Sequence, residues 1–316
     1  MRHFTSIKQF DDLKAALEAA KYVKANPFAD QALGKNKTAL LVFFNNSLRT
    51  RLSTQKAAMN LGMNVMVLDV NQGAWKLETE RGVVMDGDKS EHLLEAIPVM
   101  GCYADVIGVR SFARFESWED DYTEKILNQF IQYSGKPVFS MEAATRHPLQ
   151  TFADMLTIEE HKKTARPKVV MTWAPHPKAL PQAVPNSFAE GLSMTDYDFV
   201  IANPEGYDLA PEFTKGLRVT HNQDEALEGA DFVYAKNWAS YEQYGQVLSK
   251  DMNWTVTKEK MALTNNAFFL HCLPVRRNMI VSDDVIESPQ SLVIPEAANR
   301  VVAAQTVLKM ILQDDQ

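Results

Sequence analysis

The stretch Ala39-Leu-Leu-Val-Phe-Phe-Asn-Asn-Ser-Leu-Arg-Thr-Arg51 joins a short apolar run to a polar turn and to the first residues of a helical pattern. The apolar run is typical of a buried strand. Ser47 suits the position that caps the start of a helix, and Gly62 stands where the residue after its end is expected. The stretch therefore predicts a strand, a turn and a helix, the repeating unit of a parallel α/β sheet.

The same alternation continues along the chain and starts again after Arg166-Pro167, where the preceding helix is expected to end. Because parallel neighbours need crossover connections, this order predicts an α/β fold with two doubly wound parallel-sheet domains. The pattern leaves open on which domain the last helix packs. The predicted strands cover 39–44, 64–70, 105–109, 136–140, 168–173, 198–202, 217–220, 231–235 and 267–271, and the predicted helices cover 50–61, 91–103, 122–133, 149–162 and 297–312.

One segment breaks this rhythm. Residues 174–186 contain four prolines, at 175, 177, 181 and 185. Proline fixes φ and removes a hydrogen-bond donor, so we expect an ordered, non-helical loop after a strand. A rigid connector and a functional loop are both consistent with this pattern.

Composition excludes several classes of protein. The chain has 316 residues, 46% of them hydrophobic and 23% charged, and a net charge of −7. An acidic chain without a long basic run is a poor nucleic-acid binder. The two cysteines, Cys102 and Cys272, cannot form a disulfide framework and suit a reducing cytoplasm. We expect neither a signal peptide nor a membrane span, because the longest clean apolar run covers only 39–44.

The quoted stretch also indicates a phosphate site. A helix N-terminus offers free N–H groups and a positive dipole, and Ser47, Arg49, Thr50 and Arg51 add hydroxyl and guanidinium donors. Ligands collect at the carboxyl ends of strands in open α/β sheets, where this stretch is expected to lie. The alternative is a simple helix cap with two surface arginines.

Other polar groups follow other predicted strands. They are Arg110, then Glu142, Arg146, His147 and Gln150, and then His271-Cys-Leu-Pro274. We interpret them as donors that polarise a carbonyl group and hold its oxyanion. Cys272 could be a nucleophile or a buried small side chain, but we favour a role for the backbone carbonyls beside it. The sequence contains no nucleophile elbow, no dinucleotide-binding glycine motif and no Walker loop.

Three of these segments resemble motifs of the transcarbamylases. Ser47-Leu-Arg-Thr-Arg51 resembles their S-x-R-T-R motif, His147-Pro-Leu-Gln150 their H-P-x-Q motif, and His271-Cys-Leu-Pro274 their H-C-L-P motif. The resemblance implies a carbamoyl-phosphate domain, 1–150, that is completed by the C-terminal helix, 297–316, and an amino-substrate domain, 151–296. It also implies a homotrimer with active sites at subunit interfaces.

The chain is most similar to the acylornithine branch of that family. The D-x-x-x-S-M-G loop of the ornithine enzymes is missing, and residues 235–240 contain Lys236 in its place. Residues 71–78, the proline-rich loop and Pro274-Val-Arg-Arg-Asn278 resemble acylornithine enzymes. The resemblance implies a knotted proline-rich loop and carbamoyl transfer from carbamoyl phosphate to N-succinyl-L-ornithine in arginine biosynthesis, with N-acetyl-L-ornithine as the alternative. It implies no metal and no organic cofactor, since the leaving phosphate can accept the amine's proton.

The resemblance also implies residue roles. The residues implied to act in catalysis are Arg110, His147, Gln150 and Cys272. Those implied to bind carbamoyl phosphate are Ser47, Leu48, Arg49, Thr50, Trp75 from a neighbouring subunit, Arg110, His147, Pro148, Leu149, Gln150, Cys272, Leu273 and Arg300. Those implied to bind the acylornithine are Ser90, Glu142, His176, Lys236 and Arg276.

Ser90 bears on the choice of acyl group. In acetyl-specific relatives the matching residue is Glu, whose carboxylate would repel a succinyl group; in succinyl-specific relatives it is Pro. Ser90 is small and neutral, and Ile280 stands where acetyl-specific relatives have Lys. We therefore expect a succinyl substrate with Arg276 as the partner of its terminal carboxylate, and a structural role for Arg277.

Two other classes of protein fit the sequence less well. A catalytically inactive phosphate-binding regulatory subunit would not need the complete set of chemical residues. Knotted α/β chains include RNA methyltransferases, but a net charge of −7 and the lack of a basic patch interleaved with aromatic residues argue against that class.

Overall fold

The computed structural model describes residues 1–70 and 75–314 and contains two compact units. Unit 1 comprises Met1–Phe10, Glu18–Leu149 and Arg300–Gln316, and unit 2 comprises Asp11–Leu17 and Gln150–Asn299. The chain passes from one unit to the other inside three helices, α1 (Leu13–Ala25), α6 (Pro148–His161) and α12 (Val293–Asp314). The family resemblance implied divisions at 150/151 and 296/297 and did not assign residues 11–17 to the second unit.

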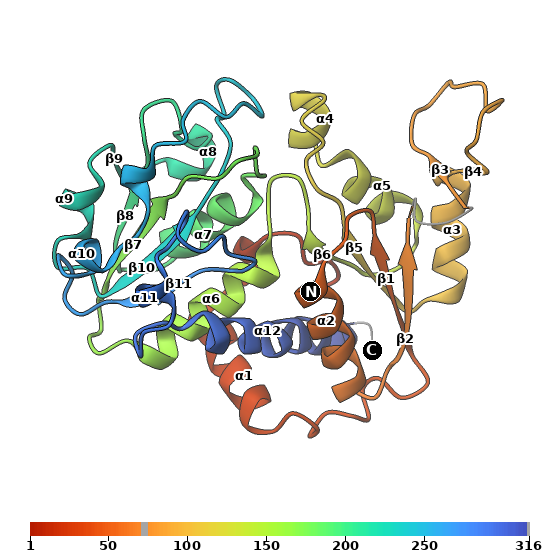
Figure 1. Ribbon diagram of the computed structural model, residues 1–316. Coiled ribbons are helices and arrows are strands. Elements are labelled where there is room, and N and C mark those ends of the chain that lie inside the picture. Colours follow the sequence, from red (N-terminus) through yellow and green to blue (C-terminus); the bar gives the residue numbers. More distant parts are fainter. Residues whose placement is uncertain (71–74, 315–316) are drawn as a thin grey trace. The chain divides into compact units, whose positions relative to one another are not determined.

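The sheet of unit 1 is entirely parallel, with the strand order β2-β1-β5-β6. Its strands are β1 (Thr38–Phe43), β2 (Asn64–Asp69), β5 (Val106–Arg110) and β6 (Val138–Glu142) (Figure 1). Apolar residues of this sheet pack against α3 (Leu93–Tyr103) and α5 (Lys125–Tyr133). Unit 1 also contains η1 (Ile7–Gln9), α2 (Leu48–Asn60), β3 (Leu77–Glu78), β4 (Glu91–His92) and α4 (Trp118–Tyr122).

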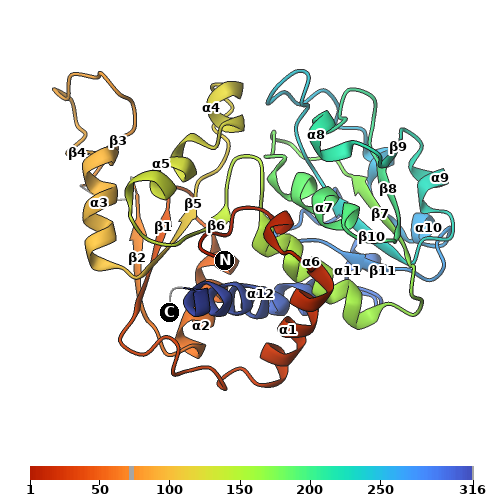
Figure 2. The same ribbon diagram turned by 180° about the vertical axis from the view of Figure 1, so that it is seen from behind.

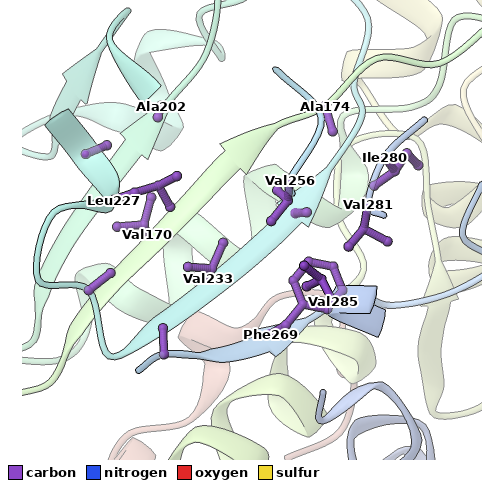
Figure 3. Packing of buried hydrophobic residues seen from close by; sticks show 14 of the residues in the cluster. Val170, Ala174, Ala202, Leu227, Val233, Val256, Phe269, Ile280, Val281 and Val285 are labelled. Carbon is purple, nitrogen blue, oxygen red and sulfur yellow. The ribbon is translucent and has the colours of Figure 1, made fainter. Parts of the chain in front are cut away.

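The sheet of unit 2 is also parallel, with the order β11-β10-β7-β8-β9. Its central strands bury a continuous apolar cluster that includes Val170, Val233, Phe269 and Val281 (Figure 3). Two parallel sheets confirm the predicted fold class. The elements of this unit are β7 (Lys168–Trp173), α7 (Ala183–Ser193), β8 (Asp198–Ala202), α8 (Pro211–Thr214), β9 (Arg218–Thr220), α9 (Gln223–Leu227), β10 (Phe232–Lys236), η2 (Met252–Trp254), α10 (Lys258–Met261), β11 (Phe268–Leu270) and α11 (Asp283–Ile286).

Two glycines shape the helices that carry predicted site residues. Gly62 has a φ of +80° directly after the cap of α2, which confirms it as the residue that ends this helix. Gly191 lies where α7 approaches α6, and a Cβ atom there would come within 2.6 Å of Thr151 Cγ2 (Figure 2). The absence of a side chain at Gly191 therefore lets the helix that carries Gln150 pack closely against α7.

The structure corrects three details of the prediction. The proline-rich segment is not helix-free, because α7 begins at Ala183; Pro185 lies in its first turn, where no N–H partner is required. Residues 91–92 belong to strand β4 instead of the predicted helix. The last helix begins at Val293, four residues before the predicted start. No helix in the described ranges is long and apolar enough to cross a membrane.

Candidate active site

The N-terminus of α2 lies directly after β1, as the sequence predicts. Ser47 caps the helix and accepts a hydrogen bond from the backbone N–H of Thr50 at 3.2 Å, which confirms its capping role. The helix has 13 residues, so its N-terminal N–H groups and dipole present a positive end at the edge of the sheet.

Two arginines converge on Thr50 at this point. Arg110, the last residue of β5, donates from Nη1 to Thr50 Oγ1 at 3.1 Å, and Arg300 of α12 donates from Nη2 to the same oxygen at 2.7 Å. Both guanidinium groups are buried. Arg110 Nε has no hydrogen-bond partner among the described residues, although it is buried. A buried donor without a partner is costly, so the arrangement calls for an additional acceptor such as a phosphate oxygen.

A carboxylate and an imidazole complete this cluster. Glu142, the last residue of β6, accepts from Arg110 Nη1 at 2.5 Å, and its Oε2 atom lies 3.3 Å from His147 Nε2. His147 Nε2 also lies 3.4 Å from Arg300 Nη2. The predicted residues Thr50, Arg110 and His147 are thus brought together with Arg300 inside unit 1. Glu142 belongs to this cluster as well, whereas the family resemblance implies that it binds the acylornithine.

Residues near the S-x-R-T-R motif differ in their surroundings. Arg51 forms an ion pair with Asp69 of β2, and its guanidinium carbon lies 4.6 Å from the centre of the Phe43 ring in β1. These contacts hold Arg51 against the two strands. Arg49 is half-buried at the start of α2.

Trp75 and Ser90 lie on the surface of unit 1. The Trp75 side chain is 62% exposed and its Nε1 donates to Glu91 at 2.9 Å, while the backbone N–H of Ser90 donates to the Lys76 carbonyl at 2.9 Å. Trp75 lies two residues before β3, and Ser90 is the last residue of the loop that runs from β3 to β4. The remaining predicted feature of this region, residues 71–74, lies outside the described residues.

In unit 2, Gln150 is fixed by two buried carboxylates. Its Nε2 atom donates to Asp154 at 2.7 Å and to Glu296 at 3.2 Å, and its Oε1 atom is buried without a partner among the described residues. Both amide hydrogens of Gln150 are therefore engaged within the protein in this structure. The group that remains for a ligand is the acceptor Oε1, which suits an NH₂ group.

The H-C-L-P segment follows β11 and is held by the same carboxylate. The backbone N–H of His271 donates to Glu296 Oε2 at 2.9 Å, and the N–H of Leu273 donates to His271 Nδ1 at 2.8 Å. His271 thus shapes the turn, and Leu273 adopts a left-handed φ of 55° there. The Cys272 side chain is buried, with 9% exposure.

A cationic group forms where the proline-rich loop passes the end of β10. The loop is joined to residues 236–239 by four hydrogen bonds, including Ala239 N–H to the Leu180 carbonyl at 2.9 Å. Lys236 Nζ donates to the Asn237 carbonyl at 3.0 Å, and Arg276 Nε donates to His176 Nε2 at 3.0 Å. Burial, followed by the positive charges of Arg276 and Lys236, lowers the pKa of His176. A neutral His176 that accepts from Arg276 leaves the arginine's terminal nitrogens directed to a carboxylate ligand.

Arg277 and Ile280, which lie close to Arg276 in the sequence, have different surroundings. Arg277 forms ion pairs with Asp283 and Glu287, as expected for a structural role. Ile280 is 1% exposed and belongs to the apolar core of unit 2, so it contributes no polar group to a site.

Sequence reasoning missed Asp154 and Glu296. Glu296 is fully buried and holds both Gln150 and the H-C-L-P turn. A signal was present: Asn299 and Arg300 follow Glu296 by three and four residues in the first half of α12, and such spacing places polar groups on one face.

Comparison with known proteins gives the family. The N-terminal part, residues 2–160, matches the aspartate/ornithine carbamoyltransferase carbamoyl-P binding domain, and residues 181–311 match the Asp/Orn binding domain of the same family. The chain is 71% identical over 315 residues to the N-succinylornithine carbamoyltransferase of Bacteroides thetaiotaomicron, with 99% of each chain covered. It is 37% identical over 335 residues to the N-acetylornithine carbamoyltransferase of Xanthomonas campestris pv. campestris, which covers 99% of this chain and 98% of the relative.

Solved structures agree with these relatives. One is the crystal structure of an N-acetyl-L-ornithine transcarbamylase variant, with one glutamate replaced by serine, in complex with carbamyl phosphate and N-succinyl-L-norvaline. It has a TM-score of 0.91 and 36% sequence identity, and the match covers 98% of this chain and 100% of that chain. This chain belongs to the aspartate/ornithine carbamoyltransferase family.

Proposed function

We propose that this protein transfers the carbamoyl group of carbamoyl phosphate to the δ-amine of N-succinyl-L-ornithine, giving N-succinyl-L-citrulline and phosphate in arginine biosynthesis. The observation that carries the proposal is the unpartnered, buried Arg110 Nε in a cluster of guanidinium groups at the N-terminus of α2. The relative that is 71% identical over nearly the full chain supports the choice of the succinylated amine.

Unit 1 would bind carbamoyl phosphate. The phosphate group would accept from the N–H groups and side chains at the start of α2, Ser47 to Thr50, and from Arg110. Arg110 and His147 would also donate to the carbamoyl oxygen, which gains negative charge when the amine attacks. Arg300 would complete this group of donors. The contacts of both arginines with Thr50 hold them in place before the substrate arrives.

Unit 2 would supply the acceptors for the carbamoyl NH₂ group. Gln150 Oε1 and the backbone carbonyls of Cys272 and Leu273 are groups of the required kind. The neutral δ-amine attacks the carbamoyl carbon, the bond from that carbon to the phosphate oxygen breaks, and the leaving phosphate takes the amine's proton. No residue forms a covalent intermediate in this scheme.

The cationic group of unit 2 would select the acylated amine. N-succinylornithine carries an α-carboxylate and a terminal succinyl carboxylate, and we assign Arg276 to the terminal one. Lys236 and His176 would hold the rest of the acylornithine, and Glu142 would contact it as well. In this assignment, both long cationic side chains meet a substrate with two negative charges.

Ser90 would admit the longer acyl group. We assign it to the position of the glutamate that is replaced in the solved N-acetyl-L-ornithine transcarbamylase variants. Those variants, including the serine one, hold N-succinyl-L-norvaline. A small neutral side chain at that position removes both the charge repulsion and the steric conflict with a succinyl carboxylate.

We also propose a homotrimer in which Trp75 reaches the site of a neighbouring subunit. The surface of unit 1 exposes apolar side chains from α2 and from the edge strand β2, and a covered interface would remove them from water. They are Leu48, Leu52 and Met59 of α2 and Met66 and Leu68 of β2. The proline-rich loop would be threaded as a knot past residues 236–239, and a chain with only two cysteines suits work in the cytoplasm.

A citrulline-specific colorimetric assay tests the proposed reaction. The enzyme is given carbamoyl phosphate with N-succinyl-L-ornithine, N-acetyl-L-ornithine or L-ornithine in separate reactions. We expect the highest kcat/KM with the succinyl substrate and little product from L-ornithine. In the Ser90→Glu variant, activity with the acetyl substrate should rise relative to that with the succinyl substrate. Faster carbamoylation of N-acetyl-L-ornithine by the unaltered enzyme would contradict the substrate assignment and leave the reaction class intact.

A further inference from the structure

Two carboxylates lie three residues apart where α4 meets α5: Asp121 belongs to the last turn of α4, and Glu124 directly precedes α5. Asp121 accepts from the backbone N–H groups of Arg114 and Phe115, each at 3.0 Å. Glu124 accepts from the backbone N–H groups of Ala144 at 2.9 Å and Thr145 at 2.7 Å. Each carboxylate thus holds two successive N–H groups of a different loop.

Both loops belong to the candidate site. The loop held by Asp121 begins directly after Arg110, at the end of β5. The loop held by Glu124 connects Glu142, at the end of β6, to His147, and it is closed by a hydrogen bond from Ala143 N–H to the Arg146 carbonyl at 2.8 Å. Asp121 and Glu124 therefore hold the loops next to Arg110 and His147, the two residues that we assign to the carbamoyl oxygen.

Glu124 is held firmly in this arrangement. The Thr145 hydroxyl donates to its Oε1 at 2.5 Å, so the carboxylate accepts three hydrogen bonds in total. Burial raises the pKa of Glu124, and the hydrogen bonds from Thr145 and Ala144 act in the opposite direction. Its backbone has a left-handed φ of 51°, a conformation that non-glycine residues rarely adopt. A strained residue persists where its side-chain contacts compensate for the strain.

We propose that Asp121 and Glu124 are positioning residues that set the loops carrying Arg110 and His147 for carbamoyl transfer. Glu124 acts through the loop that ends at His147, and Asp121 acts through the loop that follows Arg110. A displacement of such loops by a fraction of an ångström lowers the rate because the donors then miss the developing oxyanion. This inference rests on the proposed carbamoyl transfer.

The test compares purified full-length variants by kcat, by KM for carbamoyl phosphate and by Tm. Glu124→Gln keeps the shape of the side chain but directs an NH₂ group at an N–H donor. We expect kcat to fall ~10- to 100-fold with a change of less than about three-fold in KM. Asp121→Asn should instead raise KM for carbamoyl phosphate several-fold, on the order of 3- to 10-fold. The reason is that Asp121 holds the loop after Arg110, and the proposed contact of Arg110 with phosphate already exists in the ground state.

Two further variants distinguish the role of the Glu124 carboxylate from the effects of backbone conformation and of misfolding. Glu124→Gly relieves the left-handed strain but removes the carboxylate, so it should lose kcat as the Gln variant does. Thr145→Val removes only the hydroxyl donor and should lower kcat by roughly 3- to 10-fold, which keeps the proposal testable if the Glu124 variants do not fold. Asp105→Asn is the matched control: Asp105 accepts from Thr38 N–H at 2.6 Å at the amino ends of β1 and β5. It should lower the Tm without changing kcat or KM.

The outcomes are distinct. A Glu124→Gln or Thr145→Val variant with a lower Tm but unaltered kcat and KM would show a merely structural role and overturn the proposal. Full kcat in Glu124→Gly would do the same, because only the backbone conformation would matter. If the unaltered enzyme forms no carbamoylated product, the proposed function fails instead, and this result is seen before any variant is compared.

Discussion

The groups assigned to carbamoyl phosphate and those assigned to the acyl chain are built in different ways. In unit 1, Thr50, Arg110 and His147 are each no more than 6% exposed and are linked to one another through Arg300 and Glu142. In unit 2, Arg276 is exposed, and its contact with His176 uses only one guanidinium nitrogen. The first set is preorganised by buried charges, whereas the second relies on a long side chain that can adapt to its ligand.

The difference predicts different kinetic signatures. Removing a member of the buried set removes transition-state stabilisation and should mainly lower kcat. Removing the exposed Arg276 should mainly raise KM for the acylated amine and change the choice of acyl group. The following experiments test this division, beginning with the largest expected effect.

Arg110→Met should cause the greatest loss. It would remove the proposed contact with the leaving phosphate, and it leaves Glu142 buried without its guanidinium partner. We expect kcat/KM for carbamoyl phosphate to fall by ~10³-fold or more in a steady-state citrulline assay. Arg51→Met is the matched control, because Arg51 pairs with Asp69 outside the site. It should lower the Tm while kcat stays within about two-fold of its original value. Equal kinetic losses in both variants would remove the distinction between the two arginines.

Arg49→Ala gives a second test of the same site. Arg49 lies in the first turn of α2 and holds no part of the apolar core, so folding should be nearly intact. Loss of a charge-assisted contact with the leaving phosphate should lower the rate on the order of 100-fold. The measurement is kcat/KM for carbamoyl phosphate, with circular dichroism to verify folding. Near-original turnover would remove Arg49 from the phosphate site.

His147→Ala should separate chemistry from binding. The imidazole is expected to donate to an oxyanion that forms only after attack, so kcat should fall by roughly 100-fold while KM for carbamoyl phosphate changes less. Steady-state kinetics at saturating acylornithine measure both. Weakened binding with unchanged turnover would favour a purely structural histidine at the start of α6.

Arg276→Met should mainly weaken the binding of N-succinyl-L-ornithine. We expect KM for N-succinyl-L-ornithine to rise by roughly 10- to 100-fold with a smaller change in kcat, because an arginine–carboxylate pair is lost. KM for N-acetyl-L-ornithine should change less. Arg277→Met provides the control, since that arginine pairs with Asp283 and Glu287 on the surface. An equal rise of KM for both acyl substrates would contradict the assignment of Arg276 to the terminal carboxylate.

The pH dependence of His176 gives the smallest expected effect. Burial and nearby positive charges lower its pKa, so the folded state binds this proton less readily than the unfolded chain. The stabilisation by neutral His176 is therefore complete above the ordinary histidine pKa of about 6.5 and is lost as the pH falls from there through the lowered value. Urea unfolding of the unaltered enzyme and of His176→Gln should show a stability difference that shrinks between pH 7.5 and pH 5.5. A difference that grows on acidification would contradict this sign.

The sequence predicts the sheets better than it predicts the hydrogen-bond network. The run 39–44 and the cap at Ser47 are local signals, so the strand and the helix could be predicted from them. The orientation of Gln150 could not be predicted, because it depends on Asp154 and on Glu296, which lies 146 residues further along the chain. The start of α7 was missed because prolines indicate a loop, although they are tolerated in the first turn of a helix.

The choice of acyl group is the central claim and can be measured in one competition experiment. The unaltered enzyme is given limiting carbamoyl phosphate with equal concentrations of N-succinyl-L-ornithine and N-acetyl-L-ornithine, and mass spectrometry quantifies both citrulline products. Their initial ratio equals the ratio of the two kcat/KM values. We predict at least ~100 molecules of N-succinyl-L-citrulline for each molecule of N-acetyl-L-citrulline. A ratio near one, or an excess of N-acetyl-L-citrulline, would contradict the claim.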